Sequence, residues 1–402
     1  MEHAPGHSPA SILHPRRILV RGVNWLGDAV MTTPALLRLR EKFPDAHIAL
    51  LCPEKLKDLW RHHPAVDETI SFAADDSVFN VAKKIRQHAF SLSPAGGEGR
   101  GEGATSSGRF DLALVLPNSP RSALEVLLAG IPQRIGYARP WRNFFLTQAV
   151  ASRPGAVKMR KRTDEEIKAL ISQPPGLSIQ PPVIPAAAHQ THEYLHLAAA
   201  LGANPQPLAP QLVVTAEEIE SAQKNFELEK ITQPIFGLNP GAEYGPAKRW
   251  PVEKFIATAK EIQQRTNCVW LIFGGKNDAE LAGRIASEIP SHASRLTPHN
   301  LAGKTSLREL MALLKTCRVL LTNDTGPMHV AAALGTPVVV PFGSTSPELT
   351  GPGLPGDARH QLIKSDAPCS PCFLRECPID FRCMNGISVE RVVEAVIKAA
   401  AK

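Results

Sequence analysis

The sequence predicts an α/β protein made of two Rossmann-like halves, each a doubly wound parallel sheet. The main observation is a repeated pattern in which a near-continuous apolar run ends in Gly, Asn or Asp and then leads into a helical stretch. Such runs are typical of parallel strands that are buried on both faces. Their alternation with helices over the whole length indicates the doubly wound class. The runs occupy residues 17–21, 47–52, 111–118, 234–241, 268–275, 318–326 and 336–344.

The alternation pauses in a proline-rich region that ends at Pro210. We therefore expect an N-terminal domain over residues 16–210 and a C-terminal domain over residues 211–402. Residues 1–15 are predicted to be a flexible extension. Residues 91–108 contain six glycines and almost no apolar side chains, so we expect a disordered insertion there.

The composition is compatible with a soluble enzyme that acts on anionic substrates. Lys and Arg number 45 against 38 Asp and Glu, and the resulting net charge of +7 forms no Lys/Arg block. Nucleic acid is therefore not demanded as a partner, and anionic substrates fit as well. No apolar run reaches the roughly 18 residues of a transmembrane helix, and the first residues lack the features of a secretory signal. Three cysteines are scattered among apolar neighbours, so we expect a cytoplasmic protein.

The first candidate residue is Asp28, which follows the first strand. The glycine spacing of Gly22 and Gly27 mimics a phosphate-binding loop, but a carboxylate stands where the phosphate-binding lysine belongs and would repel phosphate. A carboxylate at the carboxyl edge of a parallel sheet faces the ligand crevice. There it could act as a general base toward a hydroxyl group. The alternative for Asp28 is an ordinary helix N-cap.

Two segments of the second half carry further candidates at the ends of strands. The loop 239–251 contains glycines and prolines that let its backbone approach a ligand, and Lys248 supplies a positive charge for phosphate. A surface loop with a solvated lysine is the alternative. Asp278 follows the next strand, where a carboxylate can accept hydrogen bonds from a ribose diol. A helix N-cap is the alternative for Asp278.

The segment 322–329 is the most informative one. Gly326 followed by Pro327 predicts a helix that starts directly after a strand, and the free N–H groups of such a start can bind an anion. Asp324 and His329 would flank a sugar diphosphate at this place. The alternative for His329 is a core histidine on an apolar helix.

Four cysteines crowd into residues 369–383, at Cys369, Cys372, Cys377 and Cys383. Their number suits a structural zinc ion, and Cys369 and Cys372 have the spacing of a zinc-binding pair. The longer gaps leave little room for a second pair. A disulfide, free thiols or an iron–sulfur cluster therefore remain open.

Together these stretches resemble glycosyltransferase family 9, the ADP-heptose:lipopolysaccharide heptosyltransferases. The similarity runs from residue 17 to about residue 349. Residues 116–137 and 240–251 look most like the branch that adds the second inner-core heptose (heptosyltransferase II). The resemblance implies a GT-B architecture, in which two Rossmann-like domains face a cleft that holds the active site. It also implies an inverting transfer that requires no metal or other cofactor, and the chain has no Asp-x-Asp pair of the kind that metal-dependent transferases use.

The resemblance implies roles for the candidate residues. Asp28 would be the base that deprotonates the acceptor hydroxyl, and Lys248 would neutralise the departing ADP. Asp278 matches the position that holds the adenosine ribose. The donor-binding motif of the family matches Asp324, Thr325, Gly326 and His329.

The expected partners are ADP-heptose and a heptosyl-Kdo2-lipid A acceptor, with no nucleic acid. We expect the chain to attach peripherally to the inner face of the inner membrane through its positive charge. Contacts to the acceptor are predicted for Asn118, Ser119 and Arg121, which follow a strand of the first half, and for Arg134. The two arginines would meet the acidic groups of the acceptor, and the alternative is that both are surface arginines. The rival functions are heptosyltransferase I or III specificity, a non-catalytic nucleotide-binding or cysteine-cluster interaction protein, and an NAD-dependent oxidoreductase, which the missing Gly-x-Gly-x-x-Gly motif disfavours.

Overall fold

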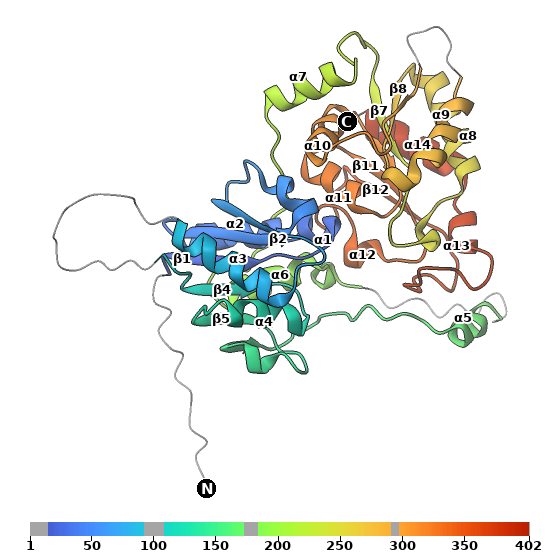
Figure 1. The fold of residues 1–402 in the computed structure, drawn as a ribbon. Coiled ribbons are helices and arrows are strands. Elements are labelled where there is room, and N and C mark those ends of the chain that lie inside the picture. The colour runs from blue at the N-terminus through green and yellow to red at the C-terminus, as the bar shows by residue number, and fades with distance from the viewer. Residues whose placement is uncertain (1–14, 92–107, 173–183, 291–296, 402) are drawn as a thin grey trace, which may run out of the picture. The chain divides into compact units, whose positions relative to one another are not determined.

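The structure, a computed structural model, describes residues 15–91, 108–172, 184–290 and 297–401 (Figure 1). The predicted extension at 1–15 and the predicted insertion at 91–108 lie almost entirely outside the described residues. Contacts divide the chain into two compact units. The N-terminal unit comprises Met1–Asn24, Pro34–Arg153 and Glu193–Gln206, and the C-terminal unit comprises Trp25–Thr33, Pro154–His192 and Pro207–Lys402.

The N-terminal unit contains a six-stranded parallel sheet whose strand order, β3-β2-β1-β4-β5-β6, is that of a Rossmann fold. The central strand β1 pairs on both sides, with Ile18 in register with Ile48 of β2 and with Leu112 of β4. All three side chains are fully buried, which explains the near-continuous apolar runs. The strands are β1 (Arg17–Arg21), β2 (His47–Pro53), β3 (Glu68–Phe72), β4 (Leu112–Val115), β5 (Gln133–Tyr137) and β6 (Gln148–Val150), and the main helices are α2 (Thr33–Lys42), α3 (Val78–Ser91), α4 (Pro120–Leu128) and α6 (Thr191–Ala199).

The C-terminal unit repeats this architecture, because its strand order, β9-β8-β7-β10-β11-β12, follows the same Rossmann pattern. Its core lies where helices such as α8 and α14 pack their apolar side chains against the sheet. Both predicted doubly wound halves are therefore confirmed. The strands are β7 (Ile235–Asn239), β8 (Val269–Ile272), β9 (His299–Asn300), β10 (Leu320–Thr322), β11 (Val338–Phe342) and β12 (Gln361–Lys364). The helices include α5 (Asp164–Ile171), α7 (Ala216–Asn225), α8 (Val252–Thr266), α9 (Ala279–Glu288), α10 (Leu307–Thr316), α11 (Gly326–Ala333), α12 (Pro347–Thr350), α13 (Arg382–Asn385) and α14 (Val389–Ala400).

The short helix α1 (Leu26–Met31) follows β1 in sequence but packs in the C-terminal unit, against α11. Two glycines permit this close approach. A Cβ on Gly27 would lie 2.7 Å from Cδ2 of His329, and a Cβ on Gly326 would lie 2.9 Å from Cδ2 of Leu26. Close-packed interiors leave no room for such contacts. The packing of α1 therefore places Asp28 in the C-terminal unit.

Among the helices that the structure describes, none has both the length and the apolar character that crossing a lipid bilayer would require.

Candidate active site

A cavity opens at the carboxyl ends of β7 and β10, where a Rossmann sheet reverses its strand order and binds ligands. Its volume is about 510 Å³, which suits a small molecule. Every residue that lines it belongs to the C-terminal unit. These residues are Trp25, Leu26, Gly27, Asp28, Met31, Met159, Lys161, Gln190, Glu243, Tyr244, Lys248, Asp324, Thr325, Gly326, Pro327, His329, Thr345, Thr350, Phe373 and Arg375.

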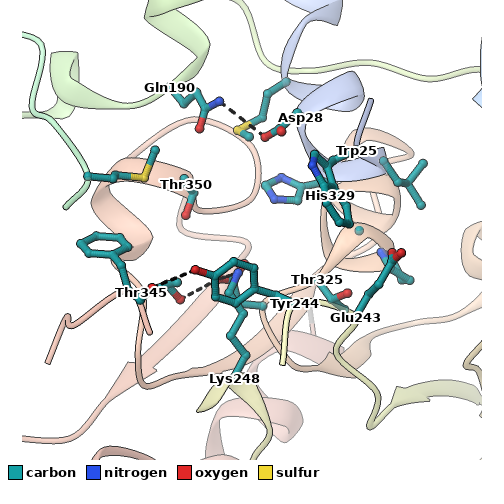
Figure 2. Close-up of a pocket in the computed structure, with 18 of the residues that line it drawn as sticks. Trp25, Asp28, Gln190, Glu243, Tyr244, Lys248, Thr325, His329, Thr345 and Thr350 are labelled. Carbon is teal, nitrogen blue, oxygen red and sulfur yellow. Dashed lines mark hydrogen bonds and ion pairs between the residues drawn. The ribbon is translucent and has the colours of Figure 1, made fainter. Parts of the chain in front are cut away.

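Asp28 lines this cavity from α1 (Figure 2). It is the third residue of the helix, whose N-cap is Trp25, so Asp28 is not the N-cap. The side-chain amide of Gln190 donates to Oδ1 of Asp28 at 3.5 Å. Burial raises the pKa of Asp28 to about 6; the positive charge of Lys248 lowers this pKa in part, and the negative charge of Asp324 raises it further. Such a carboxylate is ionised at neutral pH and still basic enough to accept a proton.

Lys248 ends the short helix η4 (Pro246–Lys248) in the loop after β7. Its Nζ lies 2.7 Å from Oδ2 of Asp324, whose side chain is 4 % exposed. The hydroxyl of Thr345 donates to the same carboxylate oxygen at 2.6 Å. Nζ of Lys248 also lies 5.0 Å from the ring centroid of Tyr244. The ammonium group is thus held at the cavity by a carboxylate and an aromatic ring (Figure 2).

Asn323 ties the loop that carries Lys248 to the end of β10. Its Nδ2 donates to the backbone oxygen of Pro240 at 2.7 Å, near the start of the loop. Its Oδ1 accepts from the N–H of Trp250 at 3.0 Å, near the end of the loop. Asn323 is fully buried, so both contacts are shielded from water. One side chain therefore fixes both ends of the loop.

Helix α11 begins beside the cavity directly after β10, as the Gly-Pro pair predicts. Its N-cap, Thr325, makes no hydrogen bond to the helix through its side chain, so this end of the helix can receive an anion. His329 lies about one turn into the helix and is buried. Burial lowers the pKa of its imidazole to about 4, so the ring is neutral at pH 7.

Asp278 follows β8 at the same edge of the sheet but does not line the cavity. Its carboxylate accepts a hydrogen bond from the N–H of Gly275 at 3.0 Å, and its Oδ1 lies 3.9 Å from Nη2 of Arg249. A side chain on Gly241 would collide with this carboxylate, so Asp278 lies against the start of the loop that carries Lys248. Its contact with an adenosine ribose stays a prediction.

The four predicted acceptor residues lie in the N-terminal unit. Oδ1 of Asn118 lies 3.4 Å from Nη1 of Arg142. Ser119 is the N-cap of α4, and Arg121 forms an ion pair with a buried glutamate at 3.0 Å. Arg134 donates to three backbone oxygens. These contacts give Ser119, Arg121 and Arg134 structural partners, and an acceptor contact stays a prediction for all four.

Sequence reasoning missed several residues of the cavity. Thr345 follows β11, and its place at the carboxyl end of a parallel strand is the one signal that could have identified it. Gln190 is brought to the cavity by a long-range contact, in which its N–H donates to the backbone oxygen of Leu349 at 2.9 Å. Tyr244 lies in the loop 239–251, where the sequence points to Lys248, and Arg375 lies among the four cysteines of residues 369–383.

The cysteine-rich segment (residues 369–383) packs in the C-terminal unit. Cys369 and Cys372 are buried in a small apolar cluster with Ile167 of α5, which explains their burial without a metal. All seven cysteines are free thiols. In the part of the chain that the structure describes, no three His, Cys, Asp or Glu side chains are placed to hold a metal ion. The predicted alternative of a structural zinc at Cys369, Cys372, Cys377 and Cys383 is therefore not supported.

The comparisons with known proteins point to one family. The model of glycosyltransferase family 9 (heptosyltransferase) matches residues 178–381. Lipopolysaccharide heptosyltransferase 2 of Escherichia coli K12 is 31% identical over 366 residues, which cover 87% of this chain and 91% of that relative. The chain belongs to glycosyltransferase family 9.

A second relative and a solved structure extend this similarity. Lipooligosaccharide heptosyltransferase 2 of Haemophilus influenzae is 28% identical over 83% of this chain and 85% of the relative. The solved structure of the E. coli ADP-heptose lps heptosyltransferase II is 27% identical, with a TM-score of 0.70 over 96% of this chain and 98% of that chain. As a member of family 9, the chain is a glycosyltransferase, and its two six-stranded parallel sheets are those of the GT-B class.

Proposed function

We propose that this family 9 glycosyltransferase transfers heptose from ADP-heptose to the first heptose of the lipopolysaccharide inner core, with heptosyl-Kdo2-lipid A as acceptor. The relatives from E. coli and H. influenzae bear the name heptosyltransferase 2, and their similarity extends over most of both chains. The observation that carries the proposal is that one cavity combines a carboxyl group of pKa about 6, a lysine and the start of a helix. Together they supply what an inverting transfer requires, a base for the acceptor hydroxyl and positive charge for the departing diphosphate.

Asp28 acts as the general base of this reaction. Its carboxylate takes the proton of the acceptor hydroxyl while the hydroxyl oxygen attacks the anomeric carbon of the donor. The bond from that carbon to the diphosphate breaks, and its electron pair leaves with ADP. A single displacement of this kind inverts the anomeric centre.

Lys248 and the start of α11 stabilise the leaving group. Negative charge grows on the diphosphate as the bond breaks, so fixed positive charge near it lowers the barrier. Lys248 supplies an ammonium group, and α11 supplies the positive end of its dipole through Thr325 and Gly326. This is the work that a divalent cation does in metal-dependent transferases, and the proposed reaction uses no cofactor.

The remaining donor contacts follow from the same arrangement. Asp324 acts on the donor through Lys248, which it positions by their 2.7 Å contact. The neutral imidazole of His329 offers one donor and one acceptor to the heptose. Asp278 accepts hydrogen bonds from the adenosine ribose. Asn118, Ser119, Arg121 and Arg134 contact the acceptor.

An assay with three acceptors tests the proposal. The full-length chain would be incubated with ADP-heptose and Kdo2-lipid A that carries no, one or two heptoses. We expect transfer and ADP release only with the acceptor that carries one heptose. Transfer to the acceptor without heptose would assign heptosyltransferase I specificity, and transfer to the one with two would assign heptosyltransferase III specificity. No transfer to any of them, with intact ADP binding, would identify a non-catalytic nucleotide-binding protein.

We further propose that the chain binds peripherally to the inner face of the inner membrane, where its lipid-linked acceptor would lie. The sequence has no uninterrupted block of Lys and Arg, but its positive charge is concentrated in one stretch. Residues 126–163 contain eight Lys and Arg and no Asp or Glu, so the remaining 37 Lys and Arg against 38 Asp and Glu leave a net charge of −1. Arg142 is buried, and Arg153 and Arg160 pair with glutamates, so the other cations of this stretch are the ones available to attract an anionic lipid surface.

Exposed apolar side chains lie in the same stretch. Trp141 is 81 % and Phe144 is 83 % exposed in the N-terminal unit, and Val157 and Met159 are exposed in the C-terminal unit. Aromatic and apolar side chains among cations are typical of segments that insert into the interface of a bilayer.

Sedimentation with vesicles tests the membrane proposal. We expect the chain to sediment with vesicles of phosphatidylcholine and phosphatidylglycerol, but not with phosphatidylcholine alone. The double variant W141S/F144S should bind less. F79S is the control, because Phe79 is also exposed, at 69 %, but lies outside residues 126–163. Unchanged binding of W141S/F144S, or equal binding to both kinds of vesicle, would contradict the proposal.

A further inference from the structure

The cysteine-rich segment is hydrogen-bonded to the loop 239–251, which carries Lys248, and its thiols take no part in these contacts. The N–H of Ala247, next to Lys248, donates to the backbone oxygen of Arg375 at 2.9 Å. The hydroxyl of Tyr244 donates to the backbone oxygen of Phe373 at 2.8 Å. Two hydrogen bonds therefore join the segment to the loop 239–251 (the lysine loop).

The same segment is fixed to the edge of the sheet after β11. The N–H groups of Cys372 and Phe373 both donate to the backbone oxygen of Ser344, at 3.1 and 2.7 Å. The hydroxyl of Ser370 donates to the backbone oxygen of Gly343 at 2.7 Å. Ser344 immediately precedes Thr345, which binds Asp324. The segment thus links the lysine loop to the residues after β11, where Thr345 hydrogen-bonds to Asp324.

Arg375 reaches the cavity from this segment. Its guanidinium carbon lies 5.1 Å from the ring centroid of Tyr244, the ring that Nζ of Lys248 approaches to 5.0 Å. Lys248 is paired with Asp324, whereas Arg375 forms no ion pair with any carboxylate of the described residues. Its positive charge is therefore not balanced by a neighbouring side chain.

We propose that Arg375 is a second diphosphate-binding residue of the donor site, and that the cysteine-rich segment positions it together with Lys248. The inference rests on the proposed function, because its ligand is the diphosphate of a nucleotide sugar. A diphosphate carries at least two negative charges, and Asp324 already offsets the charge of Lys248. A guanidinium group adds two parallel N–H donors that match phosphate oxygens, and the ring of Tyr244 orients it.

Gly245 allows the positioning part of the proposal to be tested separately. A Cβ at Gly245 would lie 2.5 Å from the backbone oxygen of Arg375, an atom that cannot turn aside as a side chain can. Gly245→Ala should therefore push the cysteine-rich segment away from the lysine loop without removing any charge.

Calorimetric binding of ADP and of adenosine to the full-length chain tests both parts. We expect R375Q to weaken ADP binding by about ten- to a hundredfold, the effect of losing hydrogen bonds to a charged group, and to leave adenosine binding unchanged. R375K should lose less, because it keeps the charge but not the paired donors. G245A should weaken ADP binding in the same sense as R375Q.

Arg382 provides the matched control. It belongs to the same segment, but it pairs with Asp380 at 3.0 Å and does not line the cavity. R382Q should bind ADP as the unchanged chain does, and thermal unfolding would confirm that each variant is folded. ADP binding by folded R375Q that equals that of the unchanged chain would overturn the inference. If the unchanged chain itself bound ADP no better than adenosine, the proposed function would fail instead.

Discussion

Nζ of Lys248 lies 2.7 Å from Oδ2 of Asp324, a carboxylate that is almost fully buried. Lys248, which is proposed to bind the diphosphate, is therefore already in an ion pair with Asp324. Such a pair fixes the position of the ammonium group closely, because a buried carboxylate must keep its hydrogen-bonding partners. The negative charge of Asp324 also offsets part of the positive charge of Lys248. The affinity of the donor site for a diphosphate therefore depends on the geometry of this pair.

Replacing Asp324 with Asn should lower both stability and donor affinity. The buried Thr345 hydroxyl loses a charged acceptor, and Lys248 loses its anchor, so we expect the free energy of unfolding to fall by about 1–3 kcal/mol. Urea unfolding measures the first effect and the KM for ADP-heptose the second. T345V removes only one hydrogen bond and should lose less than D324N. Equal stability of D324N and the unchanged chain would show that the pair does not stabilise the fold.

Replacing Asp28 with Asn should remove the general base while preserving the cavity. We expect turnover to fall by about 10²–10⁴-fold, the usual contribution of a positioned base. The affinity for ADP should stay the same, because the residues proposed to bind ADP are others. Steady-state assays and calorimetry measure the two quantities. Near-normal turnover of D28N would exclude Asp28 as the base.

The pH dependence of kcat/KM should report the ionisation of Asp28. Because the base acts in its ionised form, kcat/KM should rise as the pH increases through about 6 and then level off. His329 has a pKa of about 4 and stays neutral over this range, so H329N should leave the inflection in place even if it lowers the rate. Assays between about pH 5 and 8 test this. An inflection that moves in H329N would contradict the assignment.

Replacing Gly326 with Ala should disturb the packing of α1 on α11. The new Cβ would lie 2.9 Å from Cδ2 of Leu26, and we expect a loss of about 1–3 kcal/mol in stability. Turnover should also fall, because Asp28 moves with α1. Gly283 in α9 is the control: its nearest neighbour would be 3.6 Å away, and G283A should be neutral or stabilising by up to about 1 kcal/mol. Wild-type activity in G326A would refute the steric argument.

Thiol labelling should distinguish the cysteines of the cysteine-rich segment. Burial raises the pKa of Cys383 to about 12, and it also raises the pKa values of Cys369 and Cys372. Since the thiolate is the reactive form, these three should react slowly with iodoacetamide in the folded chain. Cys377 is more exposed and should be labelled first. Mass spectrometry after brief labelling checks the order, and fast labelling of Cys369 would contradict it.

The seven central strands with near-continuous apolar runs could be predicted because their signal is local, whereas the outer strands β3, β5, β6, β9 and β12 carry no such run. The run that forms β1 is apolar at nearly every position, and the structure buries it between two neighbouring strands. The start of α11 could also be predicted, since Gly326 and Pro327 specify a helix start directly after β10. Asp28, Lys248 and Asp324 were expected just after strands and His329 in the helix that follows, and the structure brings all four into one cavity.

Contacts between distant segments could not be predicted in this way. The packing of α1 depends on Gly27 and Gly326 together, and neither position carries a local signal for its partner. Arg375 reaches the cavity from a segment that two hydrogen bonds, donated by the N–H of Ala247 and the hydroxyl of Tyr244, join to the loop that carries Lys248. Cysteine spacing alone could not decide between the alternatives for the four cysteines, because it does not report the apolar packing around Cys369 and Cys372.

The placement of α1 has a consequence for recombining this chain with its relatives. A chimera joined at the linker near residue 210 would take Asp28 from one parent and Lys248 from the other, although both belong to the C-terminal unit. Such a hybrid would have to rebuild the contact between Gly27 and His329 from unmatched sequences. An exchange of the whole C-terminal unit, residues 25–33, 154–192 and 207–402, would instead transfer the complete cavity, so acceptor preference and donor chemistry could be inherited separately.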